Sequence, residues 1–306
     1  MNFTLNQLRI FLNIVEQKSI TKAAEKLFLT QPAVSIQLKN FQGQFDIPLI
    51  EVINKRLFVT DFGYEIAEAA KSILNEVNAI NYKKAIFEGK LTGKLKIAVV
   101  STGKYVIPYL LTDFLKVNPE VELELDVSNR GNVINNLEKN NVDFVLMTRL
   151  PENLSVESTK LFQNKLVLVG GKGSKIQFQK MKGEFFNQHR FIFRESGSAT
   201  RQAMENYLLE QKISTENILT LTSNEAVKQA VISGMGCSIV PIIGIRNELE
   251  LGQLEMLNAP GLPIENAWYL VHLKEKKLLP AARAFKLYIK ENLSSIILNY
   301  FNSKFE

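Results

Sequence analysis

The residues most suited to binding chemistry are two groups of hydroxyl side chains, each placed after a run of apolar residues. Ser101 and Thr102 follow one predicted strand, and Ser198 and Thr200 follow FIFRE (191–195). Backbone N–H groups at the start of a helix attract anions, and hydroxyl groups add hydrogen-bond donors. We therefore predict that all four bind an anion. The alternative for Ser101 and Thr102 is that they only cap the helix that follows.

Positively charged side chains occur near the same places in the sequence. Each of four cations comes just past a predicted strand or at the start of a predicted helix: Lys104, Arg130, Arg149 and Arg201. Cations that converge on one site suit a carboxylate, phosphate or sulfate group. Further candidates for direct contact are Asn129, Thr148 and Asn224. The alternative for each cation is a surface charge or an ordinary ion pair.

The sequence gives little support for catalysis. His189 and His272 are isolated, and neither an HExxH motif nor a Cys/His metal spacing occurs. GGKGSK (170–175) lacks the order GxxxxGKS/T of a phosphate-binding loop, so we interpret it as a turn. The single cysteine, Cys237, lies in an apolar run, and we interpret it as buried packing rather than as a redox sensor. We predict no enzyme activity, no metal and no cofactor.

The composition is that of an ordinary globular protein with a small excess of positive charge. A chain of 306 residues can form two or three domains, and its hydrophobic content is 46%. No apolar run approaches the roughly 20 residues needed to span a membrane. The N-terminus lacks the pattern of a secretory signal, so we expect a cytoplasmic protein. The net charge of +6 is consistent with a polyanionic partner.

Residues 19–39, SITKAAEKLFLTQPAVSIQLK, predict two short helices joined by a tight turn. The apolar residues at helical spacing, which can pack between the helices, are Ala24, Leu27, Val34 and Leu38. Polar side chains near the start of the second helix can read base edges in a major groove. The predicted DNA contacts on this helix are Thr30, Gln31, Pro32, Ala33, Ser35, Gln37 and Lys39. The alternative is a solvated helix face in a protein–protein module.

The surrounding segments complete a DNA-binding domain over residues 1–60 and a linker helix over 61–88. A helix within residues 2–17 adds a third helix, and residues 49–60 predict a β-ribbon whose basic tip, Lys55 and Arg56, contacts DNA. The linker carries apolar residues at heptad spacing. The predicted dimer contacts are Ile66, Ala70, Ile73, Val77, Ile80 and Phe87. The alternative is a helix that packs on its own domain.

Beyond a hinge at 89–93, predicted strands and helices alternate in an α/β pattern. The predicted strands are 94–100, 121–127, 143–149, 166–171, 191–196, 218–223, 237–243 and 266–273, and the helices are 105–117, 132–140, 199–211, 224–234 and 280–292. This order predicts parallel sheets flanked by helices. We expect an effector-binding domain over 94–306, with lobe I at 94–165 and 269–306 and lobe II at 166–268. A ligand cleft then lies between the lobes.

This order of elements resembles the LysR-type transcriptional regulators over essentially the whole chain. The most specific stretches are residues 19–39, LFVTDFG (57–63) and KLKIAVVSTGKYVIPYLLTDF (94–114). Five others look like the branch that includes regulators of carbon-fixation operons: VSTGKY (100–105), VSNRGNV (127–133), DFVLMTR (143–149), FRESGSATR (193–201) and SNEAVKQAVISGMG (223–236). Departures from the family pattern occur at Ile36, Phe41-Gln42 and Val52.

The resemblance implies a winged helix-turn-helix, a linker helix and a two-lobed domain like that of periplasmic binding proteins. It implies that the two hydroxyl groups of residues face each other across the cleft, which binds a small anionic metabolite. The implied macromolecular partners are double-stranded DNA, a second copy in a homodimer, further copies in a homotetramer, and RNA polymerase. Two alternatives are a solute-binding protein without a role in gene regulation and an enzyme with its active site in the cleft.

Overall fold

The computed structural model describes residues 2–54, 56–87, 91–173, 189–213 and 217–301, although the side chains at 75–76 and 78–87 are outside the description. The chain forms two compact units, Met1–Gly89 and Lys90–Glu306. Residues 89–90 of the predicted hinge lie outside the described residues, and its last residue, Gly93, begins a strand.

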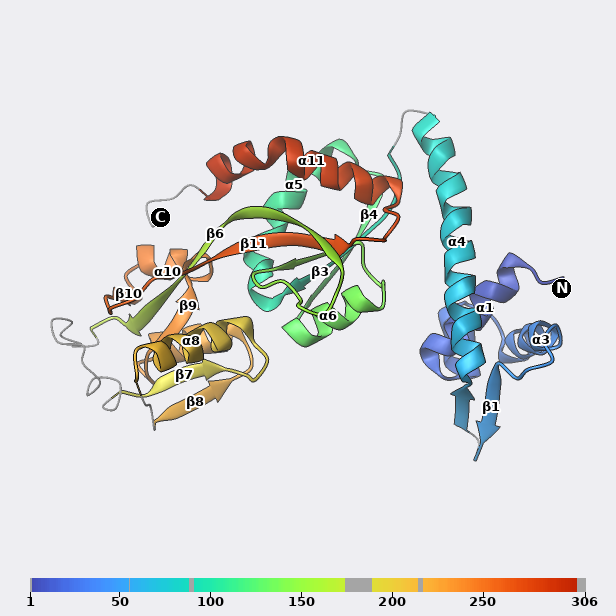
Figure 1. The fold of residues 1–306 in the computed structure, drawn as a ribbon, viewed down its shortest axis with the longest axis horizontal. Coiled ribbons are helices and arrows are strands. Elements are labelled where there is room, and N and C mark those ends of the chain that lie inside the picture. The colour runs from blue at the N-terminus through green and yellow to red at the C-terminus, as the bar shows by residue number, and fades with distance from the viewer. Residues whose placement is uncertain (1, 55, 88–90, 174–188, 214–216, 302–306) are drawn as a thin grey trace. The chain divides into compact units, whose positions relative to one another are not determined.

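The N-terminal unit is built on α1 (Leu5–Gln17), α2 (Ile20–Lys26) and α3 (Gln31–Gln42) (Figure 1). Thr4 caps α1 by accepting from the backbone N–H of Gln7, whose side chain accepts from the N–H of Thr4. The predicted packing between the helices is confirmed, because Val34 and Leu38 are buried with Ala24 in one core. Pro32 lies in the first turn of α3, where its missing N–H costs no hydrogen bond.

The predicted β-ribbon is present. Strands β1 (Ile50–Ile53) and β2 (Arg56–Val59) pair antiparallel, with Ile50 opposite Val59 and Ile53 opposite Arg56. Asn54, at the turn between them, has a φ of 50°. Asparagine tolerates this left-handed conformation better than most residues, which favours a tight turn here.

The long helix α4 (Asp61–Phe87) is also present, but its first turns pack on the core of the N-terminal unit. Ala70 is buried there and Ile66 is partly buried, so intrachain packing uses these two predicted dimer positions. For Ala70, which is 1% exposed, this packing agrees with the alternative of a helix that packs on its own domain. Ile73 is exposed and Val77 is half-buried, while the side chains of Ile80 and Phe87 lie outside the described residues.

The C-terminal unit is organised around a seven-stranded sheet in the order β10-β6-β11-β5-β3-β4, with β9 also paired to β6. Its strands are β3 (Gly93–Val100), β4 (Val121–Ser128), β5 (Phe144–Met147), β6 (Val156–Gly171), β9 (Ser238–Pro241), β10 (Leu254–Leu257) and β11 (Ile264–Leu273). The sheet is mixed, because β3 pairs parallel with β4 and β5, whereas β6 and β11 pair antiparallel. A separate parallel pair comprises β7 (Phe191–Arg194) and β8 (Ile218–Leu221).

Strand β6 is much longer than the sequence predicts. It begins at Val156 rather than at residue 166, and it runs antiparallel to β11 over most of its length. Residues 156–165 are mostly polar, since much of this segment is exposed, and they lack the continuous apolar run of a buried strand. The expected lobe boundaries at 165–166 and 268–269 thus fall inside two continuous strands that join the lobes.

Helices cover both faces of the lobe I sheet: α5 (Ile107–Val117) and α11 (Pro280–Ile296) lie on one face and α6 (Arg130–Glu138) on the other (Figure 1). Lobe II adds α8 (Ala199–Glu210), α9 (Asn224–Ile232) and α10 (Arg246–Glu250). After α11, a π-helical turn, η4 (Ile297–Phe301), buries Phe301 against the lobe I core. Most apolar residues between positions 293 and 301 therefore pack on their own lobe, whereas Leu298 is exposed.

Candidate functional site

Helix α3 presents one buried and one accessible face. Val34, Leu38 and Phe41 pack into the core, while Gln31, Pro32 and Lys39 are exposed. Ser35, Gln37 and Ala33 are half-buried beside them. Thr30 stands at the N-cap, but its side chain makes no capping hydrogen bond, so its hydroxyl is left for another partner. The structure thus places the predicted residues of this helix on its accessible side.

The accessible face of α3 also includes an apolar residue, Ile36, at which the sequence departs from the family pattern described above. Its side chain is 58% exposed. Apolar side chains on a recognition helix contact the methyl group of thymine, so Ile36 is a further candidate for base contact. On the β-ribbon formed by β1 and β2, which we call the wing, Arg56 is exposed, whereas Lys55 lies outside the described residues.

The second candidate site is a small cavity between the two lobes. Residues from the ends of β3 and β7 and from the starts of α6 and α8 line it, and η1 (Ser101–Tyr105) contributes the first hydroxyls. The predicted residues that the cavity brings together are Ser101, Thr102, Asn129, Arg130, Ser198 and Thr200. The helix N-termini of α6 and α8 meet the same cavity, and their unpaired N–H groups favour an anion.

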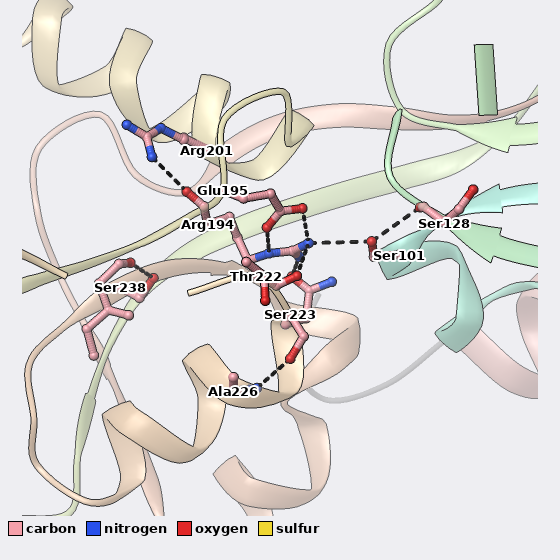
Figure 2. A network of polar contacts seen from close by, with 11 residues as sticks. Ser101, Ser128, Arg194, Glu195, Arg201, Thr222, Ser223, Ala226 and Ser238 are labelled. Carbon is pink, nitrogen blue, oxygen red and sulfur yellow. Dashed lines mark hydrogen bonds and ion pairs between the residues drawn. The ribbon is translucent and has the colours of Figure 1, made fainter. Parts of the chain in front are cut away.

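A buried arginine from lobe II links the two lobes at this cavity (Figure 2). Arg194 Nε donates to Glu195 Oε2 at 2.7 Å and Arg194 Nη2 to Glu195 Oε1 at 2.8 Å, while Nη1 donates to Asn224 Oδ1. Nη2 also reaches Ser101 Oγ of lobe I at 3.4 Å, and Ser101 in turn donates to the carbonyl of Ser128 at 3.3 Å. The guanidinium of Arg194 therefore ties the first hydroxyl of lobe I to lobe II.

Arg130 differs from Arg194 in its hydrogen bonds. It lines the cavity from the start of α6, and its Nε is buried with no hydrogen-bond partner among the described residues. Burial, together with the charge of Arg149, lowers the pKa of Arg130. A bound anion would supply both the missing acceptor and the missing counter-charge.

Other predicted residues do not line this cavity. Arg201 donates from Nη1 to the carbonyl of Arg194 at 2.9 Å (Figure 2). Its Nε donates to Glu205 at 2.6 Å, so both of these hydrogen bonds lie within lobe II. Exposed Arg149 pairs with Glu152 at 2.6 Å, and Lys104 lies 5.0 Å from the ring centre of Tyr105. Thr148 is half-buried and does not line the cavity. Asn224 does not line it either, but its Oδ1 accepts a hydrogen bond from Arg194, which does. Of the four predicted cations, Arg130 alone is among the residues that line this cavity.

Arg194 and Glu195 are site residues that were not predicted from the sequence. Both belong to the stretch FRESGSATR (193–201), which was considered only for its resemblance to a family. The signal was the position of two charged residues directly after an apolar run, because ligands of α/β proteins bind at the carboxyl ends of strands.

The cavity is small. Its volume is about 20 Å³, which holds roughly one water molecule. A metabolite needs more room than the cavity offers in this arrangement of the lobes. Among the described residues, no group of three or more His, Cys, Asp or Glu side chains is placed to hold a metal ion. None of the helices in the described part of the chain has the length and apolar character to cross a membrane.

Comparison with known protein families matches both units. Residues 5–64 match the family described as "Bacterial regulatory helix-turn-helix protein, lysR family". Residues 88–294 match the "LysR substrate binding domain". The two matches together cover most of the chain.

Known relatives match over nearly their whole length. The chain is 36% identical over 290 residues to the RuBisCO operon transcriptional regulator of Allochromatium vinosum, covering 94% of this chain and 96% of the relative. The structure of the Synechocystis PCC6803 CcmR regulatory domain in complex with 2-PG is similar, with a TM-score of 0.62 and 29% identity over 68% of this chain and 99% of that one. A full-length OxyR variant from Pseudomonas aeruginosa has the same fold, with a TM-score of 0.70 and 19% identity over 97% of this chain and 96% of that one.

Proposed function

Because this chain belongs to the LysR family of transcriptional regulators, we propose that its controlling ligand is a small phosphorylated carboxylic acid bound between the two lobes. The protein is a DNA-binding regulator with an effector domain, and its relatives are regulators rather than enzymes. This family assignment sets aside the two alternatives, a solute-binding protein without a regulatory role and an enzyme.

The unpartnered Nε of Arg130 is the observation that carries the ligand proposal. Arg130 lines a cavity that also offers hydroxyls from both lobes, Ser101 and Ser198 among them. A relative 29% identical to this chain has been solved with 2-PG, which is 2-phosphoglycolate. A phosphate group suits several donors at once, and a carboxylate suits a planar guanidinium.

The Arg194–Glu195 pair is the proposed switch. In this arrangement of the lobes Glu195 already supplies the counter-charge of Arg194. An entering anion competes with Glu195 for this guanidinium, and it thereby alters the bond from Arg194 to Ser101 that ties the lobes. A ligand that prefers one lobe arrangement by a few kcal/mol is enough to shift the population. The hinge at 89–93 then transmits the change to the DNA-binding unit.

The DNA contacts are proposed on α3 and on the wing. Gln31 suits a bidentate contact with adenine, Ser35 suits a base or a phosphate, and Lys39 suits a phosphate. The other proposed contacts are Thr30, Pro32, Ala33, Ile36, Gln37, Lys55 and Arg56. The accessible side of α3 supports this assignment for the described residues.

The assembly is proposed to be a homodimer through α4 that pairs further into a homotetramer. Exposed Ile73 and half-buried Val77 support a contact along the part of α4 beyond its own core. We extend the proposal to Ile80 and Phe87 from the heptad spacing alone. RNA polymerase is the proposed transcriptional partner, and the cytoplasm is the proposed compartment.

The ligand proposal is tested by calorimetric titration of the full chain with 2-phosphoglycolate, beside Arg130→Ala and Arg283→Ala. Arg130→Ala should weaken binding at least tenfold, because it removes a charge-assisted hydrogen bond. Arg283→Ala is the matched control, since this arginine is exposed on α11 and does not line the cavity, and its affinity should stay within about threefold. Equal effects of the two substitutions, or no binding by the unsubstituted chain, would contradict the proposal.

A further inference from the structure

A second cavity lies away from the interlobe cleft, against the two long strands that join the lobes. Its volume is about 220 Å³, compared with about 20 Å³ for the cleft cavity. Phe162 of β6 and Trp268 of β11 form one part of its wall, and Ile242 of η3 (Ile242–Gly244), Arg246 of α10 and Phe301 form another.

An irregularity in the sheet shapes this cavity. Ala267 pairs with Gln163, whereas Tyr269 pairs with Lys160, so Trp268 lies opposite two residues of β6, Leu161 and Phe162. Such a β-bulge re-aims a side chain, and bulges are over-represented beside functional sites. The cavity is therefore placed where the strand pairing departs from its regular register.

Three residues that line this cavity each carry a buried polar atom with no hydrogen-bond partner among the described residues. They are Trp268 Nε1, Arg246 Nε and Asn164 Oδ1. Asn164 Nδ2 donates to Asn266 Oδ1 at 2.7 Å, which leaves its own carbonyl oxygen free. Buried polar groups are nearly always paired, because an unpaired one loses its hydration without compensation. Two donors and one acceptor at one cavity thus indicate a ligand with complementary groups.

The charge of the lining indicates the sign of that ligand. Arg246 and Lys165 both line the cavity, and no acidic side chain is among the described residues that do so. Arg246 is held in place because Nη1 and Nη2 donate to the carbonyls of Tyr300 and Phe301, at 3.3 and 3.1 Å. Its third nitrogen, Nε, has no acceptor among the described residues. The rest of the wall includes Phe162, Ile242 and Phe301, which suit an apolar body.

We propose that this cavity is a second ligand site, for a small hydroxy acid with an apolar body. The carboxylate accepts from Trp268 Nε1 and Arg246 Nε, and the hydroxyl donates to Asn164 Oδ1. The apolar part packs against the two phenylalanine rings. This site is separate from the anion site between the lobes, and it does not depend on which ligand that cleft binds.

Trp268 makes the proposal directly measurable, because it is the only tryptophan in the chain. We would titrate the full chain with mandelate, a hydroxy acid with a phenyl ring, and follow tryptophan emission. Mandelate should give a saturable change, and its uncharged amide should bind at least tenfold more weakly. No saturable change up to about 10 mM mandelate, a concentration that would still detect a very weak complex, would overturn the proposal.

Substitutions then test the assigned atoms. Arg246→Met should weaken mandelate binding at least tenfold, whereas Arg283→Met, at an exposed arginine on α11, should leave it unchanged. Arg246→Met also removes the hydrogen bonds to the carbonyls of Tyr300 and Phe301 in η4, so weaker binding by this variant alone does not identify Nε as the contact. A second variant, Asn164→Ala, is therefore judged by the ratio of its affinities for mandelate and phenylacetate. The unsubstituted chain should prefer mandelate to phenylacetate, and Asn164→Ala should abolish that preference. An unchanged preference, or competition between mandelate and 2-phosphoglycolate for one site, would overturn the assignment.

Discussion

At the scale of single residues, two arginines at the interlobe cavity differ in whether their N–H groups have hydrogen-bond partners. Arg194 has Glu195, Asn224 and Ser101 as partners, whereas the buried Nε of Arg130 has none among the described residues. An unsatisfied buried donor costs about 1–3 kcal/mol, which an anion can recover on binding. Ligand affinity should therefore depend on Arg130 more directly than on any cation that already has a partner.

The single cysteine provides a pH prediction at the same scale. Burial raises the pKa of the Cys237 thiol to about 11, against an ordinary value near 9. The unfolded chain therefore loses this proton at lower pH than the folded chain, and the thiol's contribution to stability falls as pH rises from about 9 to 11. At pH 10 the expected loss is on the order of 1 kcal/mol relative to pH 8.

Urea unfolding of the native chain and of Cys237→Ala, at both pH values, measures this loss. The loss attributable to the thiol should be absent from Cys237→Ala, although other groups still titrate in both proteins. A buried neutral thiol is also unreactive, so dilute peroxide should leave DNA binding unchanged. Equal pH dependence of the two proteins, or peroxide-sensitive binding, would contradict the buried assignment.

Gln31 and Lys39 provide a second prediction, because their proposed roles on DNA differ. Lys39→Ala should weaken binding to specific and non-specific DNA alike and lower the salt dependence, log K against log salt, by about one unit. Gln31→Ala should instead reduce the preference for the specific site and leave the salt slope unchanged. Fluorescence anisotropy over a series of salt concentrations separates the two effects. The same slope for Lys39→Ala and the unsubstituted chain would remove Lys39 from the phosphate contacts.

At the scale of elements, a glycine sets the contact between α4 and the wing. A Cβ added at Gly63, in the first turn of α4, would lie 2.0 Å from the carbonyl oxygen of Leu49 and 2.9 Å from Val59 Cγ1. The start of the long helix and the base of the β-ribbon therefore approach more closely than any other residue type permits. This contact fixes the wing to the helix inside the N-terminal unit.

Gly63→Ala should accordingly destabilise the N-terminal unit by about 2 kcal/mol or more, because backbone must move to relieve the overlap. Gly43→Ala is the matched control, since its added Cβ would come no closer than 3.4 Å to the Lys39 carbonyl, and its cost should stay within about 0.5 kcal/mol. Thermal unfolding and DNA affinity near 25 °C measure both variants. Similar melting temperatures for the two would show that the close contact is absent.

At the scale of the whole molecule, the proposed regulation couples a DNA-binding unit to a ligand cleft in a different unit of the chain. Such coupling is a free energy shared by two sites, and it is reciprocal by thermodynamic necessity. The strands that join the lobes, β6 and β11, are continuous across both, so a change of lobe angle is carried by the same sheet that holds the core of lobe I.

The coupling prediction is quantitative. If 2-phosphoglycolate changes the affinity for an operator fragment by a given factor, the operator should change the affinity for 2-phosphoglycolate by the same factor, within the roughly 5–150-fold range of typical couplings. The fragment would come from footprinting the protein on its host DNA. Arg130→Ala should bind the operator normally but lose the response to ligand. Operator affinity that saturating ligand leaves unchanged would contradict this coupling.

Sequence by itself determined the features that depend on neighbouring residues. The spacing of Val34 and Leu38 established the buried face of α3, and the hydroxyls after two apolar runs indicated the cleft, because local patterns decide where helices and strands begin. Tertiary structure alone decided which charges meet there. Arg194 reaches Ser101 across 93 positions of sequence, and Trp268 faces a bulge in a distant strand. Burial of Ala70 and the partners of Arg201 likewise depend on where the chain returns in space, since side-chain environments are set by packing between elements and not by sequence spacing.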